Sequence, residues 1–489
     1  MTTRRMFLKT IGAGLAVAAV GRAAPARKPN ILIVIGDDMT WHDCEPYGSP
    51  DVKTPHMARL AREGMRFDHM FTATAMCAPT RQQLYTGLFP VRNGAYPNHS
   101  GVYPGTRSLP HHLKALGYRV GLIGKTHFKP RECYPFEILR GGKGGASNTT
   151  AIAEFVNRDK SQPYCLVVCS NEPHKPWNKG DTSAYDAAKL TVPPYLADTP
   201  VTRQEMAKYF AEITFLDGQL GACMKIVDDS GRRDDTIVAF TSEQGSQFPF
   251  GKWTCYDAGL RTAFLVRWPA RVKPGSVAKA MVQYVDVVPT LIEAAGGDPA
   301  KVDTGRPDAR GSRGFDGRSF LGVLLGRTDE HRDLVYGCHT TRGIINGSAC
   351  YPIRSVRSAT HKYIRNLTPD ATFTNIICPS GRDNAVVDSW AEAGGAAAAR
   401  ARAYQHRPGE ELYDLTKDPW ELHNIAADPA CAEVKAALSK SLDAWMAQQG
   451  DEGVATEMKA RERQRGQRAG KTDGGEKKRP PKRRETGKR

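Results

Sequence analysis

Four short apolar runs, each followed at once by charged or polar side chains, are the feature of this 489-residue sequence that most limits its fold. The runs are NILIVIGDD (30–38), YRVGLIGKTH (118–127), YCLVVCSNEPH (164–174) and TIVAFTSEQG (236–245). Continuous apolar runs of this length are typical of buried strands in a parallel sheet. Ligands of such sheets gather at the carboxyl ends of the strands. We therefore expect an α/β fold with one site where the four runs end.

Helical patterns separate these runs and define the expected layers. Residues 109–117 precede the second run, and apolar residues recur at helical spacing along one face of residues 204–228. Helices that connect parallel strands cover both faces of their sheet. We therefore expect residues 29–335 to form an α/β catalytic domain, with a mostly parallel central sheet flanked by helices.

The pattern changes after about residue 335. Short strand-like pieces follow, with the sequences LVYGCH, YPIRSVRSATHKYIRNL and EELYDL, and then a helical pattern at about 431–449. This mixture predicts a smaller C-terminal α+β domain over residues 336–450. The alanine-rich stretch 391–403 fits either a loop or a short helix. Residues 451–489 are basic and almost free of apolar side chains, which predicts a disordered tail that is solvated or weakly attracted to polyanions.

The net charge of +17 lies almost entirely at the two ends of the chain. Residues 1–28 contribute +6 and residues 458–489 contribute +10, so the body is nearly neutral and does not favour a nucleic-acid partner. The N-terminal stretch joins a twin arginine, a short apolar run and an A-P-A cleavage site. It predicts a Tat-type signal peptide in residues 1–28 and the Tat export machinery as a partner. We expect a periplasmic or secreted protein with no stable membrane insertion.

The eleven cysteines form no close metal-type pair, and any disulfide pairing is not evident from the sequence. Cys165 and Cys169 lie in an apolar run, which is typical of buried, small hydrophobic side chains. The sequence also leaves the oligomeric state open.

Two pairs of oxygen-bearing side chains follow two of the predicted strands. Adjacent carboxylates such as Asp37 and Asp38 repel each other unless a cation lies between them. Glu243 and Gln244 add further oxygen ligands at another strand end. An all-oxygen set of this kind favours a hard cation, Ca²⁺ before Mg²⁺.

The segment CAPTR places Cys77 four residues before Arg81. Pro79 suits the first turn of a helix, so Cys77 is expected near a helix N-terminus, where N–H groups and the helix dipole favour an anion. Arg81, one turn later, is a fixed cation that can hold an oxyanion. A thiolate nucleophile would also fit. However, the loop of cysteine-dependent phosphatases has its arginine six residues after the cysteine, so that alternative fails on spacing.

The pattern C-x-P-x-R followed by LYTG resembles the signature of the type I, formylglycine-dependent sulfatases of the alkaline phosphatase superfamily. The similarity extends over nearly the whole predicted mature chain. It includes PNILIVIGDD, TPHMARLAREGMRF, CAPTRQQLYTG, GYRVGLIGKTH, FTSEQG and ELYDLTKDPWELHNIA. The resemblance implies a sulfatase-like fold and hydrolysis of sulfate esters or sulfamates.

The resemblance also implies that Cys77 is a precursor. A formylglycine-generating enzyme acting on residues 77–81 would convert it to formylglycine, whose aldehyde hydrates to a geminal diol. One hydroxyl attacks sulfur and the leaving group departs, which gives a covalent sulfate intermediate. Deprotonation of the second hydroxyl then expels sulfate and restores the aldehyde. Because the Tat pathway exports folded protein, we expect the conversion before export.

The resemblance further implies a role for each matching residue. Those that bind the metal, together with residue 77, are Asp37, Asp38, Glu243 and Gln244. Those that hold the diol and sulfate oxygens are Arg81 and Lys125. His127 assists deprotonation of the diol. His174 and Lys252 contact sulfate and protonate the leaving atom.

The chain departs from the family at one pair of positions. Sulfatases mostly carry Asp followed by Asn or His where this chain has Glu243 and Gln244. Each side chain is one methylene longer, which leaves the position and identity of the metal open. A site that has lost its metal is the alternative.

Within the family, the stretches GLIGKTHFKPRECYPFE, NEPHKPW, FTSEQGSQFPFGK and CYPIRSV are most similar to the heparan N-sulfatases. This similarity implies the N-sulfo group of glucosamine in heparan-type glycans as the target, and glycosaminoglycan degradation as the context. The residues it implies at the sugar pocket are His99, Glu172 and Arg354. A salt bridge in the smaller domain explains Arg354 equally well.

Three alternatives stay open. The chain could be an O-sulfatase on another sulfated glycan, or a phosphonate or phosphodiester hydrolase of the same superfamily. It could also be an inactive polyanion-binding protein with an unmodified Cys77 and a basic tail.

Overall fold

The computed structural model describes residues 27–469 apart from 141 and 380. The predicted signal peptide up to residue 26 and residues 470–489 of the predicted tail lie outside the described residues. Among the helices in the described part, none combines the length and apolar character needed to cross a bilayer.

A central sheet of eight strands, ordered β4-β3-β5-β1-β6-β7-β2-β8, is found within the described residues. Its strands are β1 (Asn30–Gly36), β2 (Met65–Phe71), β3 (Arg119–Gly124), β4 (Glu137–Ile138), β5 (Tyr164–Cys169), β6 (Thr236–Ser242), β7 (Arg261–Arg267) and β8 (Ser276–Gln283). Neighbouring strands are parallel except that β7 runs antiparallel to both β6 and β2. The predicted α/β class with a mostly parallel sheet is confirmed.

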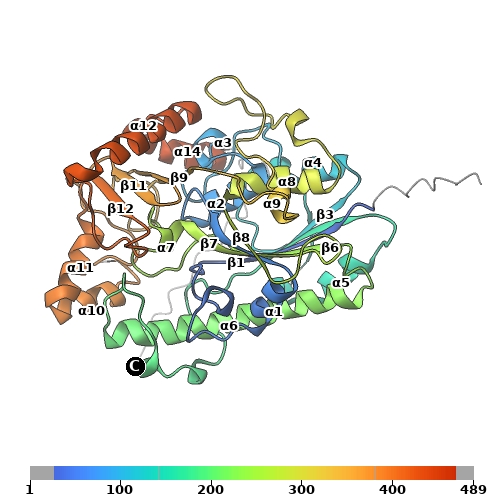
Figure 1. Ribbon diagram of the computed structural model, residues 1–489, viewed down its shortest axis with the longest axis horizontal. Helices are drawn as coiled ribbons and strands as arrows, with labels where there is room; N and C mark the ends of the chain where they lie inside the picture. The colour runs from blue at the N-terminus through green and yellow to red at the C-terminus, as the bar shows by residue number, and fades with distance from the viewer. Residues whose placement is uncertain (1–26, 141, 380, 470–489) are drawn as a thin grey trace, which may run out of the picture.

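Alternate residues of the central strands are buried on opposite faces of the sheet. Leu32 and Val34 of β1 pack on the face covered by α1 (Pro55–Glu63), α5 (Thr149–Asn157) and α6 (Pro200–Asp229). Ile31 and Ile33 pack on the other face. The helices on that side are α2 (Cys77–Thr86), α4 (Leu109–Ala115), α8 (Val287–Ala294) and α9 (Leu321–Leu324). Figure 1 shows α6 and α1 below the sheet and α8, α9 and α4 above it.

The helices predicted between the runs form where expected. Residues 109–117 contain α4, and residues 204–228 lie inside α6. The apolar stripe of α6 is buried, including Met206, Phe210 and Leu216. Thr199 accepts a hydrogen bond from Thr202 N at the start of this helix, and Pro200 occupies its first turn.

A second, antiparallel sheet of order β12-β11-β10-β9 follows within the described residues. Its strands are β9 (Val335–His339), β10 (Ile353–Arg357), β11 (His361–Asn366) and β12 (Glu410–Asp414). The predicted helix near the C-terminal end is α12 (Ala432–Gln449), which packs on β10 and β11. The alanine-rich stretch is helical, within α10 (Ala385–Ala393) and α11 (Gly395–Gln405). The predicted smaller α+β unit is confirmed, while a domain boundary at residue 335 stays a prediction.

The prediction of disorder from residue 451 onwards is wrong for residues 451–469. Two further helices form there, α13 (Val454–Met458) and α14 (Ala460–Ala469); the short α3 (Pro90–Asn93) and α7 (Asp257–Leu260) lie earlier in the chain. Glu457 is fully buried and accepts hydrogen bonds from Thr341 N, Thr341 Oγ1 and Arg342 N. Arg463 stacks on Tyr103. These few polar contacts order the segment, although its composition lacks the apolar residues that usually predict a fold.

All eleven cysteines lie within the described residues as free thiols, and Cys165 and Cys169 are buried in the core as expected.

Candidate active site

The four polar strand ends meet at one edge of the central sheet. Strands β3, β5, β1 and β6 are consecutive in the sheet order, and all neighbours among them are parallel. Their carboxyl ends therefore lie side by side. The residues that directly follow them are Lys125 and His127 after β3, Glu172 and His174 after β5, Asp37 and Asp38 after β1, and Glu243 and Gln244 after β6. The sequence-based expectation of one shared site is met by this topology.

Cys77 is the first residue of α2 and faces the strand ends. Its Sγ lies 3.8 Å from Asp37 Oδ1 and 3.9 Å from Asp38 Oδ1. The side chain is almost fully buried, and every residue of α2 is buried with it. The preceding Met76 is extended, as is usual for a residue that caps a helix N-terminus. The chain thus presents the small Cys77 side chain, at the N-terminus of α2, to the carboxylate cluster.

Three basic side chains each pair with one carboxylate of the cluster. The pairs are Lys125 with Asp37, Lys252 with Asp38 (2.6 Å between Nζ and Oδ2), and Arg81 with Glu243. Arg81 and Lys252 are almost inaccessible to solvent, so their charges act through a medium that screens them little. Each of the three carboxylates thus has a cationic partner.

The donor atoms fit a divalent cation. One ligand atom from each of Asp37, Asp38, Cys77 and Glu243 lies within 4.8 Å of the others, and all four residues are buried. Gln244 reaches the same place: its Nε2 lies 2.6 Å from Asp38 Oδ1, while its buried Oε1 has no hydrogen-bond partner among the described residues. The longer side chains at 243 and 244 therefore still reach the cluster. Carboxylate and amide oxygens are suitable ligands for Ca²⁺ or Mg²⁺.

Opposing charges set the ionisation of the acidic groups. Burial and the neighbouring Glu243 carboxylate raise the pKa of Asp37 well above its usual range. Burial also opposes ionisation of Glu243, but Arg81 and Lys125 outweigh it and hold the pKa of Glu243 well below its usual range. Although burial and Glu243 oppose it, Lys125 and Lys252 lower the pKa of the Cys77 thiol.

The two histidines at the strand ends have opposite protonation states at neutral pH. The charge of Lys252 and burial oppose protonation of His174, yet the carboxylate of Asp38, 3.6 Å from His174 Nε2, raises its pKa to about 9. Burial and then Lys125 lower the pKa of His127 to about 3. A protonated His174 can donate a proton, and a neutral His127 can accept one.

Unusual backbone geometry is concentrated at the site. Asp38, His99 and His127 have φ angles of 69°, 59° and 48°, in the left-handed region that side chains other than glycine seldom adopt. Gly124, directly before Lys125, has φ 92°, and a Cβ there would lie 2.0 Å from the carbonyl oxygen of Cys169. Such strain is found where a fold holds side chains in a required position. The sequence offered no signal for it.

A cavity of about 560 Å³ opens onto the cluster. Its lining includes the predicted residues Asp37, His99, Lys125, His127, Glu172 and His174. The rings of His99 and His127 are 5.1 Å apart, and Glu172 pairs with Lys179. Lys175 and Lys179 also line the cavity. Sequence reasoning did not single them out, although both follow β5 in the same loop as His174.

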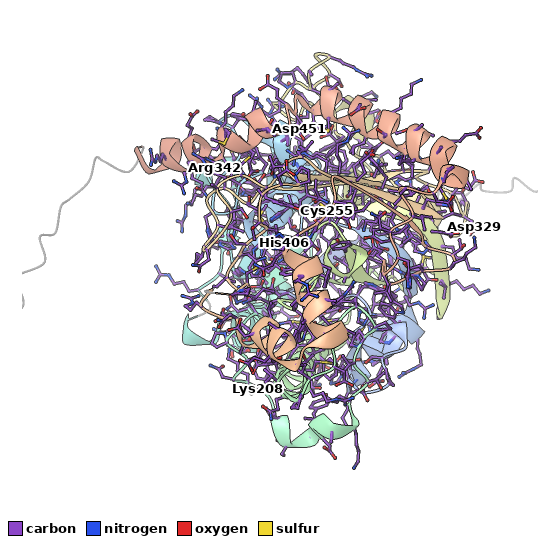
Figure 2. All side chains as sticks on the ribbon, turned by 90° about the vertical axis from the view of Figure 1, so that its left-hand side faces the viewer. Lys208, Cys255, Asp329, Arg342, His406 and Asp451 are labelled. Atoms are coloured by element: carbon purple, nitrogen blue, oxygen red, sulfur yellow. The ribbon has the colours of Figure 1, made fainter. Side chains whose placement is uncertain are left out.

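Arg354, expected at the sugar pocket, is not brought to this cavity. It is fully buried in β10 and forms a two-pronged ion pair with Asp451, whose Oδ1 lies 3.0 Å from Arg354 Nη2. Its Nη1 also donates to the carbonyl oxygen of His339. Figure 2 labels Asp451 beside the C-terminal helices. The predicted contact between Arg354 and the substrate is therefore wrong. The alternative, a salt bridge, is correct, because Asp451 accepts the hydrogen bonds of the buried guanidinium.

Comparisons with known proteins agree with this geometry. The sulfatase family profile matches residues 29–297, and the profile described as N-sulphoglucosamine sulphohydrolase, C-terminal, matches residues 245–368. The chain is 34% identical over 438 residues to an ulvan-active sulfatase of Formosa agariphila, covering 88% of this chain and 82% of that one. It is 28% identical over 468 residues to human N-sulphoglucosamine sulphohydrolase, covering 86% of this chain and 90% of that one.

Two solved structures share the fold. One, determined with D-glucosamine-2-N,6-O-disulfate as its substrate, has a TM-score of 0.65 at 21% identity and covers 87% of this chain and 99% of that one. The other, a phosphonate monoester hydrolase of Agrobacterium radiobacter, has a TM-score of 0.65 at 18% identity and covers 86% of this chain and 96% of that one. At these identities the two likenesses extend to the fold and no further.

Proposed function

We propose that this chain, which belongs to the sulfatase family, removes sulfate from a sulfated saccharide. The proposed target is the N-sulfo group of glucosamine in heparan-type glycans. As a sulfatase it is a hydrolase of sulfate esters or sulfamates. The observation that carries the proposal is the position of Cys77, buried at a helix N-terminus against Asp37 and Asp38. The similarity of residues 245–368 to the C-terminal part of N-sulphoglucosamine sulphohydrolases supports the N-sulfo preference.

Conversion of Cys77 to formylglycine is part of the proposal. The segment 77–81 matches the family signature, and a formylglycine-generating enzyme would act on it as a partner. The hydrated aldehyde supplies a nucleophilic hydroxyl and a second one for release of sulfate, which a thiol does not. We propose export through the Tat system to the periplasm or the medium after this step.

The charge of each residue around position 77 determines the catalytic role proposed for it. Arg81 and Lys125 pair with Glu243 and Asp37, two carboxylates of the cluster that contains Cys77. This supports their role as partners of oxygens at residue 77 and on sulfate. His127, neutral at neutral pH, is the proposed base for residue 77. His174, protonated at neutral pH and 3.6 Å from Asp38, is the proposed acid for the leaving atom, with Lys252 beside it.

Asp37, Asp38, Glu243 and Gln244, together with residue 77, are the proposed ligands of a divalent cation. Bound there, Ca²⁺ or Mg²⁺ would stabilise negative charge on oxygen and polarise S–O bonds. We favour Ca²⁺, because a set of carboxylate and amide oxygens suits its flexible coordination shell.

Cation binding has a readout that does not depend on turnover. Adding Ca²⁺ to metal-stripped protein is expected to raise its melting temperature, because binding to the folded state alone stabilises it by about 2.7 kcal/mol at a free concentration 100 times the dissociation constant. Differential scanning calorimetry with Ca²⁺ and Mg²⁺ measures this and ranks the two ions. Asp38→Asn should lose most of the response. Asp217→Asn, which changes a buried carboxylate held by the backbone N–H groups of His56 and Met57, should keep it. An unchanged melting temperature with both ions would contradict the site.

The experiment that tests the function is a substrate panel with purified, formylglycine-containing enzyme. Sulfate release is measured from N-sulfoglucosamine, from glucosamine 6-O-sulfate and from ulvan oligosaccharides, and phosphate-ester cleavage from a phosphodiester. We expect the highest kcat/KM on N-sulfoglucosamine. The 34% identity to an ulvan-active sulfatase makes O-desulfation of ulvan the second candidate, which would be supported by faster release from ulvan. Faster cleavage of the phosphodiester than of every sulfated sugar would refute both.

A further inference from the structure

A second cavity continues the active-site cavity away from Cys77. The first has a volume of about 560 Å³ and the second about 460 Å³. Lys175 and Pro176 line both, so the two cavities meet at the loop that follows β5. A molecule bound at the strand ends can therefore extend into the second cavity without leaving the protein surface.

The second cavity has an aromatic side chain in its wall. Trp177 is held by a hydrogen bond from its Nε1 to the carbonyl oxygen of Pro173 and by stacking on Phe248, with ring centroids 5.0 Å apart. Lys175 Nζ lies over the Trp177 ring, 4.5 Å from its centroid. A fixed aromatic ring beside a cation is suited to a ligand that is partly apolar and partly anionic.

Two further cations face this cavity, Lys208 of α6 and Arg382 of the loop before α10. Figure 2 labels Lys208 in the lower part of the molecule and Asp451 in the upper part. Glu205 lies between two lysines, with its carboxylate 3.3 Å from Lys175 Nζ and 2.7 Å from Lys208 Nζ. One carboxylate shared by two ammonium groups leaves the local charge positive.

Arg382 is the cation best placed to receive a ligand. It is exposed, and within the described part of the chain its guanidinium forms no hydrogen bond or ion pair. The adjacent Asp383 lines the same cavity and does not pair with Arg382; its Oδ2 accepts a hydrogen bond of 3.1 Å from Gln247 Nε2. A guanidinium offers two parallel N–H groups that match the oxygens of a sulfate or a carboxylate.

We propose that the second cavity is a subsite for a neighbouring sugar residue that carries an anionic group, bound by Arg382 and Lys208. The preferred substrate is then an anionic oligosaccharide and not a single sulfated sugar. This inference rests on the proposed function, since it places the next sugar of the same substrate. The anionic group is a sulfate or a carboxylate, both of which present the oxygens that a guanidinium binds.

Kinetics on matched substrates test the subsite. The substrates are one sulfated monosaccharide and three disaccharides that carry the same cleavable sulfate, with a neutral, a sulfated or a carboxylated second sugar. The quantity compared is the ratio of kcat/KM for each disaccharide to that for the monosaccharide. Wild-type enzyme should favour an anionic second sugar about tenfold, and this ratio should fall with rising salt. Whichever anionic disaccharide has the higher ratio identifies the group.

The variants decide which residues are responsible. Arg382→Ala is expected to remove most of the preference, and Arg382→Glu to reverse it. Lys208→Ala should lower it about threefold, as expected for a partly exposed ion contact. Lys225→Ala is the matched control, because Lys225 is an exposed lysine on the same helix, paired with Asp229, and lies outside both cavities. An unchanged ratio in Arg382→Ala and Arg382→Glu would overturn the subsite.

A binding measurement separates failure of the subsite from failure of the proposed function. Calorimetry with the Cys77→Ala protein and the anionic disaccharides requires no turnover. Binding that weakens about tenfold when Arg382→Ala is added supports the subsite even if no substrate of the panel releases sulfate. Equal affinity with and without Arg382→Ala overturns it even if the enzyme proves to be an active sulfatase.

Discussion

Replacing Cys77 with alanine is expected to lower kcat/KM for sulfate release at least about 10⁴-fold, as is typical when a nucleophile is removed. The reason is geometric. Residue 77 starts α2 and lies within 3.8 Å and 3.9 Å of the carboxylates of Asp37 and Asp38. Alanine leaves no atom there that can attack sulfur. Initial rates on the best substrate of the panel measure the effect, and circular dichroism checks that the variant folds.

Serine at the same position separates attack from release. Cys77→Ser offers one hydroxyl where a hydrated aldehyde offers two. It should therefore release at most about one desulfated sugar per enzyme molecule and keep the sulfate as a serine ester. Mass spectrometry of the peptide that contains residue 77 gives an independent result for the wild-type protein from its native host. Cys223→Ala is the matched control, because Cys223 is equally buried but lies in α6. A fully active wild-type enzyme whose peptide carries only an intact thiol would contradict the formylglycine proposal.

The site could be predicted largely because its residues follow strands with unmistakable apolar patterns. Asp37, Lys125, His174 and Glu243 each come directly after such a run or within a few residues of it. In a parallel sheet, the carboxyl ends of the strands lie at one edge, so residues that follow neighbouring strands lie close together. The order β3-β5-β1-β6, which makes them neighbours, is a tertiary result. The sequence alone did not specify it.

Arg354 shows where motif similarity is insufficient. Its partner Asp451 lies 97 positions later in the chain and just outside the predicted domain, in a segment whose composition indicated disorder. Local patterns carry no information about a pairing at that distance. A guanidinium pairs equally well with a carboxylate of the protein and with one of a ligand. The residue type alone therefore could not distinguish a structural ion pair from a substrate contact. The same is true of Arg382: it forms no hydrogen bond or ion pair with the described residues, which only the folded protein reveals.

Lys125 is expected to be nearly as important as Cys77. Lys125→Ala should lower kcat/KM about 10³-fold, as for the loss of one oxyanion partner. Lys125 pairs with Asp37, and its Nζ lies 3.7 Å from Glu243 Oε1. Without this charge, the buried Asp37 carboxylate loses its cationic partner beside Glu243, although Glu243 keeps Arg81. The metal-stripped variant should therefore also be less stable by about 3 kcal/mol.

A divalent cation should restore much of that stability while leaving turnover low, because it can offset the carboxylates but cannot replace the ammonium group beside residue 77. Urea unfolding with and without Ca²⁺, together with initial rates, measures both effects. Lys189→Ala is the control: its side chain is 84% exposed and pairs with Asp186 at the surface, so both quantities should stay at wild-type values. Wild-type turnover in Lys125→Ala would refute its place at the sulfate. Lost turnover with unchanged stability of the metal-stripped protein would instead show that Asp37 and Glu243 do not depend on this lysine for their charge balance.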